Sequence, residues 1–181
     1  MTASPLPADP SEVARLSDVA RLSEIARLGL DREEQSQHLR GIVDDVAAHL
    51  DQPWAWITIF LDDTQVFAAT HGDFDLAAKA NGVPNQRGLD PATFRDGEPV
   101  AFADLLLVEA YRENPNVTEY GSRNFVGVPL ISRSGFLLGV LCASGTQPRE
   151  YDAAEVAFLQ EKAAEALVWL SPVWLSGPTP A

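Results

Sequence analysis

The clearest pattern along the chain is helical, and it occurs twice. In residues 31–50 the apolar positions repeat every three or four residues, with polar residues between them. Pro53 cannot continue a helix, so this pattern predicts a helix that ends near Leu50. The second pattern follows Asp152, where Glu155 completes the spacing of a capping box and predicts a final helix. The apolar positions are Leu39, Ile42, Val43, Val46, Ala47 and Leu50, then Val156, Leu159, Ala163, Leu167 and Leu170.

Between these helices the sequence changes to short runs rich in β-branched and aromatic residues. Residues 54–61 and 65–70 predict one pair of strands, and residues 124–131 and 136–143 predict another, each pair joined by turn residues. A further short strand is expected at 100–102. The predicted fold class is therefore α+β: an antiparallel sheet of five to six strands, flanked by N- and C-terminal helices.

The middle of the chain is irregular. Residues 71–100 contain enough glycine and proline to predict a long segment without regular structure, except for a short helix around 91–95. A helical turn is expected at 104–111, ending before Asn114-Pro115. Because a long irregular segment inside a compact domain is usually functional, this region is expected to have a functional role.

The first thirty residues contain a six-residue repeat, with copies at 11–16, 17–22 and 23–28. Its apolar residues fall at every third position and shift by about 60° per step around a helix, which does not fit a sustained heptad seam. One interpretation is a helix that dimerises or binds a partner. The other is an arm that packs on its own domain or forms a loosely ordered leader. Gly29 is expected to end the helix.

Composition narrows the functional classes. The chain has 181 residues, 46% of them hydrophobic, with 13 Lys+Arg against 26 Asp+Glu and a net charge of −13. This indicates one folded domain with appendages and disfavours partners such as nucleic acid or an anionic membrane surface. The acidic excess lies mainly in residues 31–122, so the nearly neutral ends suit helix–helix association. No secretory signal or membrane-spanning run is recognised, so a cytoplasmic location is expected.

The chain offers little for catalysis. Cys142 is the only cysteine, which excludes an intramolecular disulfide, a two-thiol redox cycle within the chain and a cysteine-rich zinc site. Nucleophile-elbow, phosphate-loop and dinucleotide-binding glycine motifs are absent. We therefore expect no enzymatic activity, no metal site and no cofactor. One alternative is a haem sensor with His71, at the end of the second predicted strand, as the axial ligand.

Several short motifs occur in an order typical of one family. They are Asn114-Pro-Asn-Val117, Gly121-Ser-Arg123, Phe125-Val-Gly-Val-Pro-Leu130, Gly135-Phe-Leu-Leu-Gly-Val-Leu-Cys142 and Pro148-Arg149, followed by the capped final helix. Together, over about residues 31–170, they resemble the GAF domain family of small-molecule sensor domains. Residues 90–94 lack the cysteine that many relatives carry at this point, so a covalently bound bilin is not expected.

The resemblance implies an arrangement of domains and a pocket. It implies a GAF-like domain at 31–171. The repeat adds an N-terminal arm at 1–30, helical or partly disordered, and the composition of the C-terminal end predicts a flexible tail at 172–181. In the family the ligand lies between one face of the sheet and the irregular region. The residues expected to line this pocket are Trp56, Thr93, Phe94, Phe102, Asp104, Tyr120, Phe125 and Cys142.

The resemblance also implies a noncatalytic sensory or regulatory function. The expected partners are an unknown small molecule and a second copy or signalling protein bound through the terminal helices. Because the chain shows no output domain, the signal is expected to leave through another chain. The alternative from a different class is a pure interaction or dimerisation module whose pocket is closed by its own side chains.

Overall fold

The fold is a single antiparallel sheet covered by two long helices on one face. The computed structural model describes residues 17–30, 32–73, 83–85, 88–89 and 97–170. The described elements are α2 (Val19–Ile25), α3 (Glu33–Leu50), β1 (Trp54–Phe60), β2 (Thr64–His71), β3 (Val83–Pro84), β4 (Val100–Phe102), the 3-10 helix η2 (Leu105–Leu107), α6 (Pro115–Thr118), β5 (Asn124–Ile131), β6 (Leu137–Gly145) and α7 (Ala153–Trp169). The predicted α+β class is confirmed.

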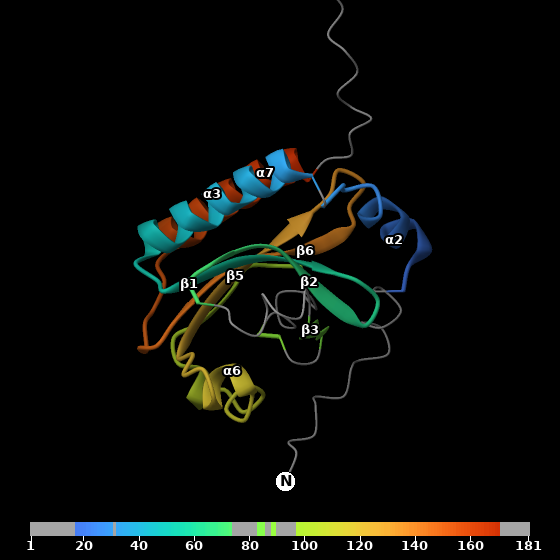
Figure 1. Ribbon diagram of the computed structural model, residues 1–181. Coiled ribbons are helices and arrows are strands. Elements are labelled where there is room, and N and C mark those ends of the chain that lie inside the picture. The colour runs from blue at the N-terminus through green and yellow to red at the C-terminus, as the bar shows by residue number, and fades with distance from the viewer. Residues whose placement is uncertain (1–16, 31, 74–82, 86–87, 90–96, 171–181) are drawn as a thin grey trace, which may run out of the picture.

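The sheet has six strands in the order β3-β2-β1-β6-β5-β4, and each neighbouring pair is antiparallel. Both predicted hairpins, β1–β2 and β5–β6, are present. The first and last main strands of the sequence, β1 and β6, lie side by side at its centre. Helices α3 and α7 lie together over one face, whereas β3 and α6 lie toward the other side (Figure 1).

Helices α3 and α7 form where the apolar stripes predict them. All six predicted apolar positions of α3 are buried, and Asp51 ends the helix in the left-handed conformation with φ 50°. In α7 the capping box is present, since Asp152 accepts from Glu155 N at 2.9 Å and Glu155 accepts from Asp152 N at 3.0 Å. Their buried side chains meet those of the sheet in a helix-side core that includes Val43, Val128 and Leu159.

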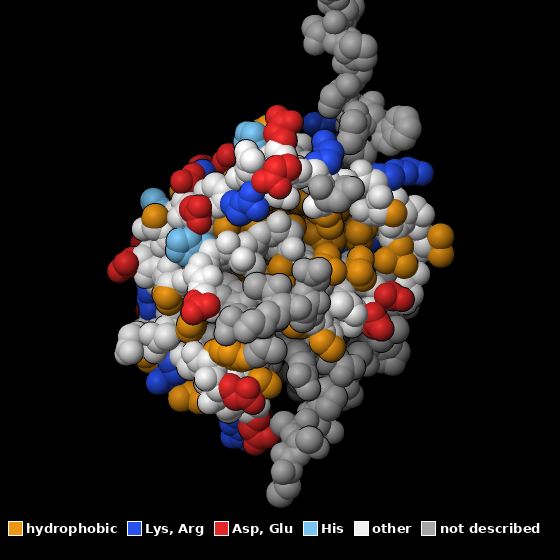
Figure 2. Space-filling view, viewed as in Figure 1, with side chains coloured by type: hydrophobic (Ala, Val, Ile, Leu, Met, Phe, Trp, Pro, Cys, Tyr) orange, Lys and Arg blue, Asp and Glu red, His pale blue; other side chains and the backbone are white. Residues whose placement is uncertain are grey.

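The outer surface of the helix layer is charged. Acidic and basic side chains are interspersed over it in Figure 2. An ion pair on this surface joins the two helices, because Lys162 Nζ of α7 lies 2.7 Å from Asp45 Oδ2 of α3. None of the helices in the described part of the chain is both long and apolar enough to cross a membrane.

The described part of the N-terminal arm packs on the domain. It contains the second and third copies of the repeat, whereas the first copy lies outside the described residues. Ile25 and Leu28 join the helix-side core. Arg21 is 3% exposed, donates from Nε to Leu137 O at 2.7 Å and from Nη2 to Phe60 O, and so binds the ends of two central strands. These contacts favour the interpretation of an arm that packs on its own domain.

Helix α2 ends at Ile25, four residues before Gly29, so the expectation that Gly29 ends the helix is wrong; with φ +63°, Gly29 lies in the turn that follows it. The buried amide of Gln35 then connects this corner with the end of the last helix. Its Nε2 donates to Leu28 O at 2.8 Å and to Trp169 O at 2.7 Å. The His38 ring stacks on Trp169, with 3.5 Å between the ring centroids.

Two short elements differ from the sequence predictions. Strand β3 pairs Val83 and Pro84 with β2 inside the segment expected to be irregular. Helix α6 begins at Pro115, where we expected a helical turn to have ended, because Asn114 caps the new helix by accepting from Asn116 N at 2.9 Å. The helix predicted at 91–95 lies outside the described residues, as does the predicted tail, and the proposed domain boundaries stay predictions.

Candidate functional site

The face of the sheet opposite α3 and α7 carries a second hydrophobic cluster, which we call the aromatic face. Its buried residues are Trp56, Phe60, Leu89, Leu105, Tyr111, Val117, Phe125, Val140 and Cys142. Successive side chains of a strand point to opposite faces of the sheet. The residues next to each helix-side residue therefore point to the aromatic face. Residues from η2 to α6 complete the cluster from outside the sheet.

The strand register brings the predicted residues together in two rows. In one row Trp56 lies opposite Cys142, which lies opposite Gly127. In the adjacent row Ser144 lies opposite Phe125, which lies opposite Phe102. Directly opposed residues share a face of the sheet. Three of the residues predicted to line a pocket, on three different strands, therefore belong to one buried cluster.

The rings of this cluster make tilted contacts. The centroid of Phe125 lies 6.1 Å from that of Trp56 and 6.3 Å from that of Phe102. The Tyr111 centroid lies 5.2 Å from that of Phe102. Tilted pairs at these separations are favourable beyond the area that they bury. Phe125 and Cys142 are fully buried and Trp56 is 6% exposed.

The other predicted residues have different positions. Phe102 is partly buried and packs against the cluster, whereas Tyr120 is 39% exposed and is not among its members. Thr93 and Phe94 lie outside the described residues. The sequence analysis missed Phe60, Tyr111 and Gln65 on this side. Their alternation with helix-side residues was the available signal for Phe60 and Gln65.

Asp104, predicted as a polar contact to a ligand, makes an ion pair with Arg123. Arg123 donates from Nε to Oδ1 at 2.9 Å and from Nη2 to Oδ2 at 2.6 Å, so both carboxylate oxygens are occupied. Oδ1 also accepts from Leu106 N at 3.1 Å and caps η2. The hydrogen bonds from Arg123 lower the pKa of Asp104, and Asp104 raises the pKa of Arg123. The pair joins η2, which contributes to the aromatic face, to the start of β5.

We expect Asp104→Asn to lower stability at neutral pH and to lose this effect in acid. Because the pKa of Asp104 is lowered on folding, the carboxylate stabilises the native state above its unfolded pKa, about 4. That contribution is lost as the pH falls through the lowered native pKa. Urea unfolding at pH 7 and pH 2.5 should show the gap between wild type and variant narrowing in acid. Glu109→Gln, which removes an exposed carboxylate 3.6 Å from Arg112, is the control and should change little at either pH. A gap that stays constant with pH contradicts the prediction.

The structure contradicts the haem interpretation that rested on His71. In the β1–β2 register His71 lies opposite Ala55, which belongs to the helix-side core. Its Nδ1 lies 2.6 Å from Asp44 Oδ1 of α3. His71 therefore lies on the other side of the sheet from the aromatic face and cannot ligate a group bound there. Among the described residues there is no cluster of three or more metal-binding side chains.

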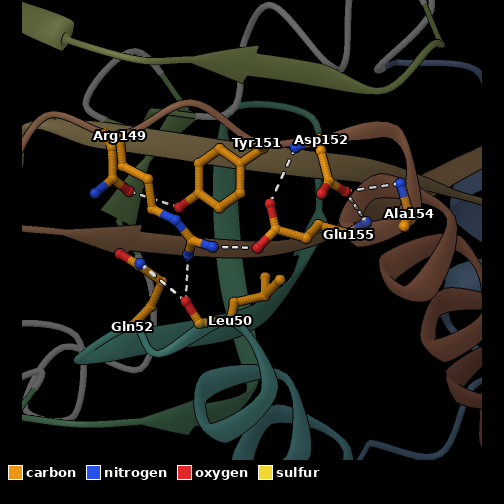
Figure 3. A network of polar contacts seen from close by, with 8 residues as sticks. Leu50, Gln52, Arg149, Tyr151, Asp152, Ala154 and Glu155 are labelled. Atoms are coloured by element: carbon orange, nitrogen blue, oxygen red, sulfur yellow. Dashed lines mark hydrogen bonds and ion pairs between the residues drawn. The ribbon is translucent and has the colours of Figure 1, made fainter.

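The Pro-Arg motif has a structural role at the edge of the helix layer (Figure 3). Arg149 donates to Leu50 O at the end of α3 and to Glu155 in the first turn of α7. Its guanidinium lies 4.7 Å from the ring centroid of Tyr151. The Tyr151 hydroxyl donates to Asn124 Oδ1 at 2.6 Å, and burial raises its pKa. Arg149 thus connects both long helices with each other, and Tyr151 connects them with β5.

Comparisons with known proteins identify relatives of this fold. A family model, the GAF domain, matches residues 36–168. No curated protein matches the chain. The GAF domain from a phosphoenolpyruvate-protein phosphotransferase of Coxiella burnetii is 22% identical, with a TM-score of 0.64 over 86% of this chain and 94% of that chain.

Two other solved structures come from different functional settings. The blue-light absorbing form of the PixJ GAF domain from Thermosynechococcus elongatus is 16% identical, with a TM-score of 0.62 over 85% of this chain and 89% of that chain. The free methionine-R-sulfoxide reductase from Neisseria meningitidis, in complex with its substrate, is 19% identical, with a TM-score of 0.62 over 94% and 96%. At these identities the likeness shows a shared fold.

Proposed function

The chain belongs to the GAF domain family, and on that premise we propose that it is a noncatalytic sensory or regulatory domain that binds a small molecule on its aromatic face. The observation that carries this proposal is the buried cluster of Trp56, Phe125 and Cys142 on the sheet face that the long helices leave uncovered. Small-molecule sites are mostly apolar and aromatic, with few polar groups.

The contacts around this face support a route from the site to the chain ends. Leu105 and Tyr111 pack onto the sheet from the η2 region, so a ligand entering there would displace them. Phe60 belongs to the aromatic face, and its carbonyl accepts from Arg21 in α2. A shift of Phe60 would therefore reach the N-terminal segment, through which we propose that a second copy or a partner protein receives the signal.

The proposal predicts that the purified chain carries or binds a small molecule. Native mass spectrometry should show a non-covalent adduct, or one member of a neutral metabolite panel should raise the melting temperature. A ligand at 100 times its Kd stabilises by about 2.7 kcal/mol, which a thermal shift assay detects easily. Phe125→Leu should reduce this shift, whereas Phe158→Leu, on α7 and away from the face, should leave it unchanged.

The rival function, a pure interaction module, is supported by the burial of the cluster. Its buried members are each at most 6% exposed, so their side chains largely fill the face themselves. This function predicts no adduct and no thermal shift, together with a mass in light scattering that doubles as the concentration rises. Absence of any ligand would therefore contradict the sensor proposal, and a monomer at high concentration would contradict dimerisation.

The noncatalytic assignment rests on the thiol content of the chain. One neighbour is a methionine sulfoxide reductase, so its fold also supports catalysis. A thiol that reduces a sulfoxide becomes a sulfenic acid, which a second thiol resolves as a disulfide. This chain has only Cys142, which is fully buried, and so offers no second thiol of its own. We propose that Cys142 acts as a small apolar side chain of the aromatic face.

A further inference from the structure

One polar side chain on the aromatic side of the sheet has an unpaired atom. Gln65 of β2 is 2% exposed and lies opposite Phe60 of β1, so its side chain shares the face to which Phe60 belongs. The Oε1 atom of Gln65 is buried and accepts no hydrogen bond. A buried acceptor without a donor destabilises the folded state. It lowers the equilibrium constant for folding by about tenfold or more.

The amide of Gln65 has a close neighbour in the segment after β3. A Cβ atom at residue 88 would lie 2.4 Å from Gln65 Nε2 and 3.0 Å from Oε1, so the amide packs directly against the backbone of Gly88. The next residue, Leu89, belongs to the aromatic face. The amide therefore packs against Gly88, next to a residue of the aromatic face, and its oxygen accepts no hydrogen bond.

Two other buried glutamines provide a comparison. Gln35 and Gln52 also have an unpaired Oε1, but each uses its Nε2 to bind backbone carbonyls. The Nε2 of Gln35 joins two segments, and the Nε2 of Gln52 binds Leu50 O, so both have evident structural roles. Gln65 lies on the aromatic side of the sheet, where a ligand is proposed to bind.

We propose that Gln65 Oε1 is the polar specificity contact for a neutral, planar ligand that carries an N–H donor. This inference rests on the proposed function, which places the ligand on the aromatic face. Planarity follows from the surrounding rings, which favour a flat apolar molecule. Neutrality follows from charge: among the residues that the structure describes, Arg21 is the only charged side chain that is buried, and it binds the carbonyls of Leu137 and Phe60.

The first test compares probes that differ only in the donor. Pyrrole and furan, indole and benzofuran, and carbazole and dibenzofuran are matched pairs of one, two and three rings in which N–H is replaced by O. By titration calorimetry on the full chain, we expect one N–H member to bind at least tenfold more tightly than its oxygen partner, because a site that hydrogen-bonds a donor rejects the analogue without it. In Gln65→Met, which has a similar volume, this ratio should fall to about one.

The second test needs no ligand. Gln65→Met removes an unsatisfied buried amide, so the melting temperature of the ligand-free protein should rise by about 2–4 °C. Gln35→Met is the matched control: it removes two hydrogen bonds far from the face, and it should lower the melting temperature while keeping the wild-type ratio of N–H to oxygen probes. A residue that reduces apo stability but increases binding selectivity is typical of a functional site.

The outcomes separate this inference from the function on which it rests. Equal binding within every probe pair, no binding of any probe, or a wild-type ratio in Gln65→Met would overturn the role of Gln65. A lower melting temperature in Gln65→Met would overturn it as well. If a different molecule nevertheless copurifies with the protein and its binding depends on Phe125, the sensor proposal stands without the Gln65 contact. If no molecule binds by either approach, the sensor proposal itself fails.

Discussion

Gly139→Ala is expected to destabilise the domain by about 3 kcal/mol, at the upper end of the range for over-packing. Gly139 lies in β6 at the centre of the sheet, between β1 and β5. A Cβ atom there would lie 1.8 Å from Thr58 O and 3.0 Å from the Cα of Ile59, and both are backbone atoms that no rotamer change can move. The central strands would have to separate. Urea unfolding followed by circular dichroism measures the loss.

The matched control adds the same methyl group where there is space. Gly41 lies within α3 on its exposed face, and a Cβ atom there meets nothing within 4 Å. Because glycine is less favourable than alanine inside a helix, Gly41→Ala should raise stability by about 0.5–1 kcal/mol. Similar effects at the two positions would show that the close approach of β6 to β1 is not the cause.

Arg21→Met is expected to cost about 2–3 kcal/mol and to release α2 from the domain. The guanidinium is buried and donates hydrogen bonds to two strand carbonyls. Its removal leaves both carbonyl oxygens without these hydrogen bonds. Burial lowers the pKa of Arg21 to about 10, so it remains charged at neutral pH. Hydrogen exchange should show faster exchange throughout residues 19–28 in the variant, and urea unfolding gives the free energy.

Arg27→Met tests whether the position or the charge matters. Arg27 occupies the same position in the next copy of the repeat, but it is exposed. Its replacement removes the same charge and should change stability by less than about 0.5 kcal/mol. If Arg27→Met loosened α2 as much as Arg21→Met, then the net charge of the segment, and not the two hydrogen bonds of Arg21, would hold it in place.

The long helices and the hairpins could be predicted from local pattern alone. The apolar stripe of α3 and the capping box of Asp152 and Glu155 depend only on residues a few positions apart. Such local patterns can be recognised without knowing the tertiary contacts. The start of α6 was also visible, because Asn114 followed by proline is a capping sequence, although we interpreted the proline as a stop. Two-residue β3 is too short for any period to show.

The roles of individual side chains depended on contacts between distant segments. Arg21 and Arg27 are equivalent in the repeat, and only the carbonyls of β1 and β6 distinguish them. Asp104 was predicted as a polar contact to a ligand, whereas the contact that the structure shows is with Arg123, nineteen residues away. The oxygen of Gln65 is unpaired because of how several segments pack around it. The spacing of residues along the sequence cannot predict that.

The contact between Gln35 and both ends of the domain has a consequence for how the chain can be reconnected. Since one nitrogen binds Leu28 O and Trp169 O, the points where the chain enters and leaves the folded domain are adjacent. A short linker from residue 170 to residue 28, with new termini in the exposed turn at Asp62 and Asp63, should give a circular permutant that keeps the sheet, α3 and α7, and that lacks α2 and with it the stability that Arg21 contributes. The same geometry would allow residues 28–170 to be inserted into a surface loop of another protein without spreading the loop apart.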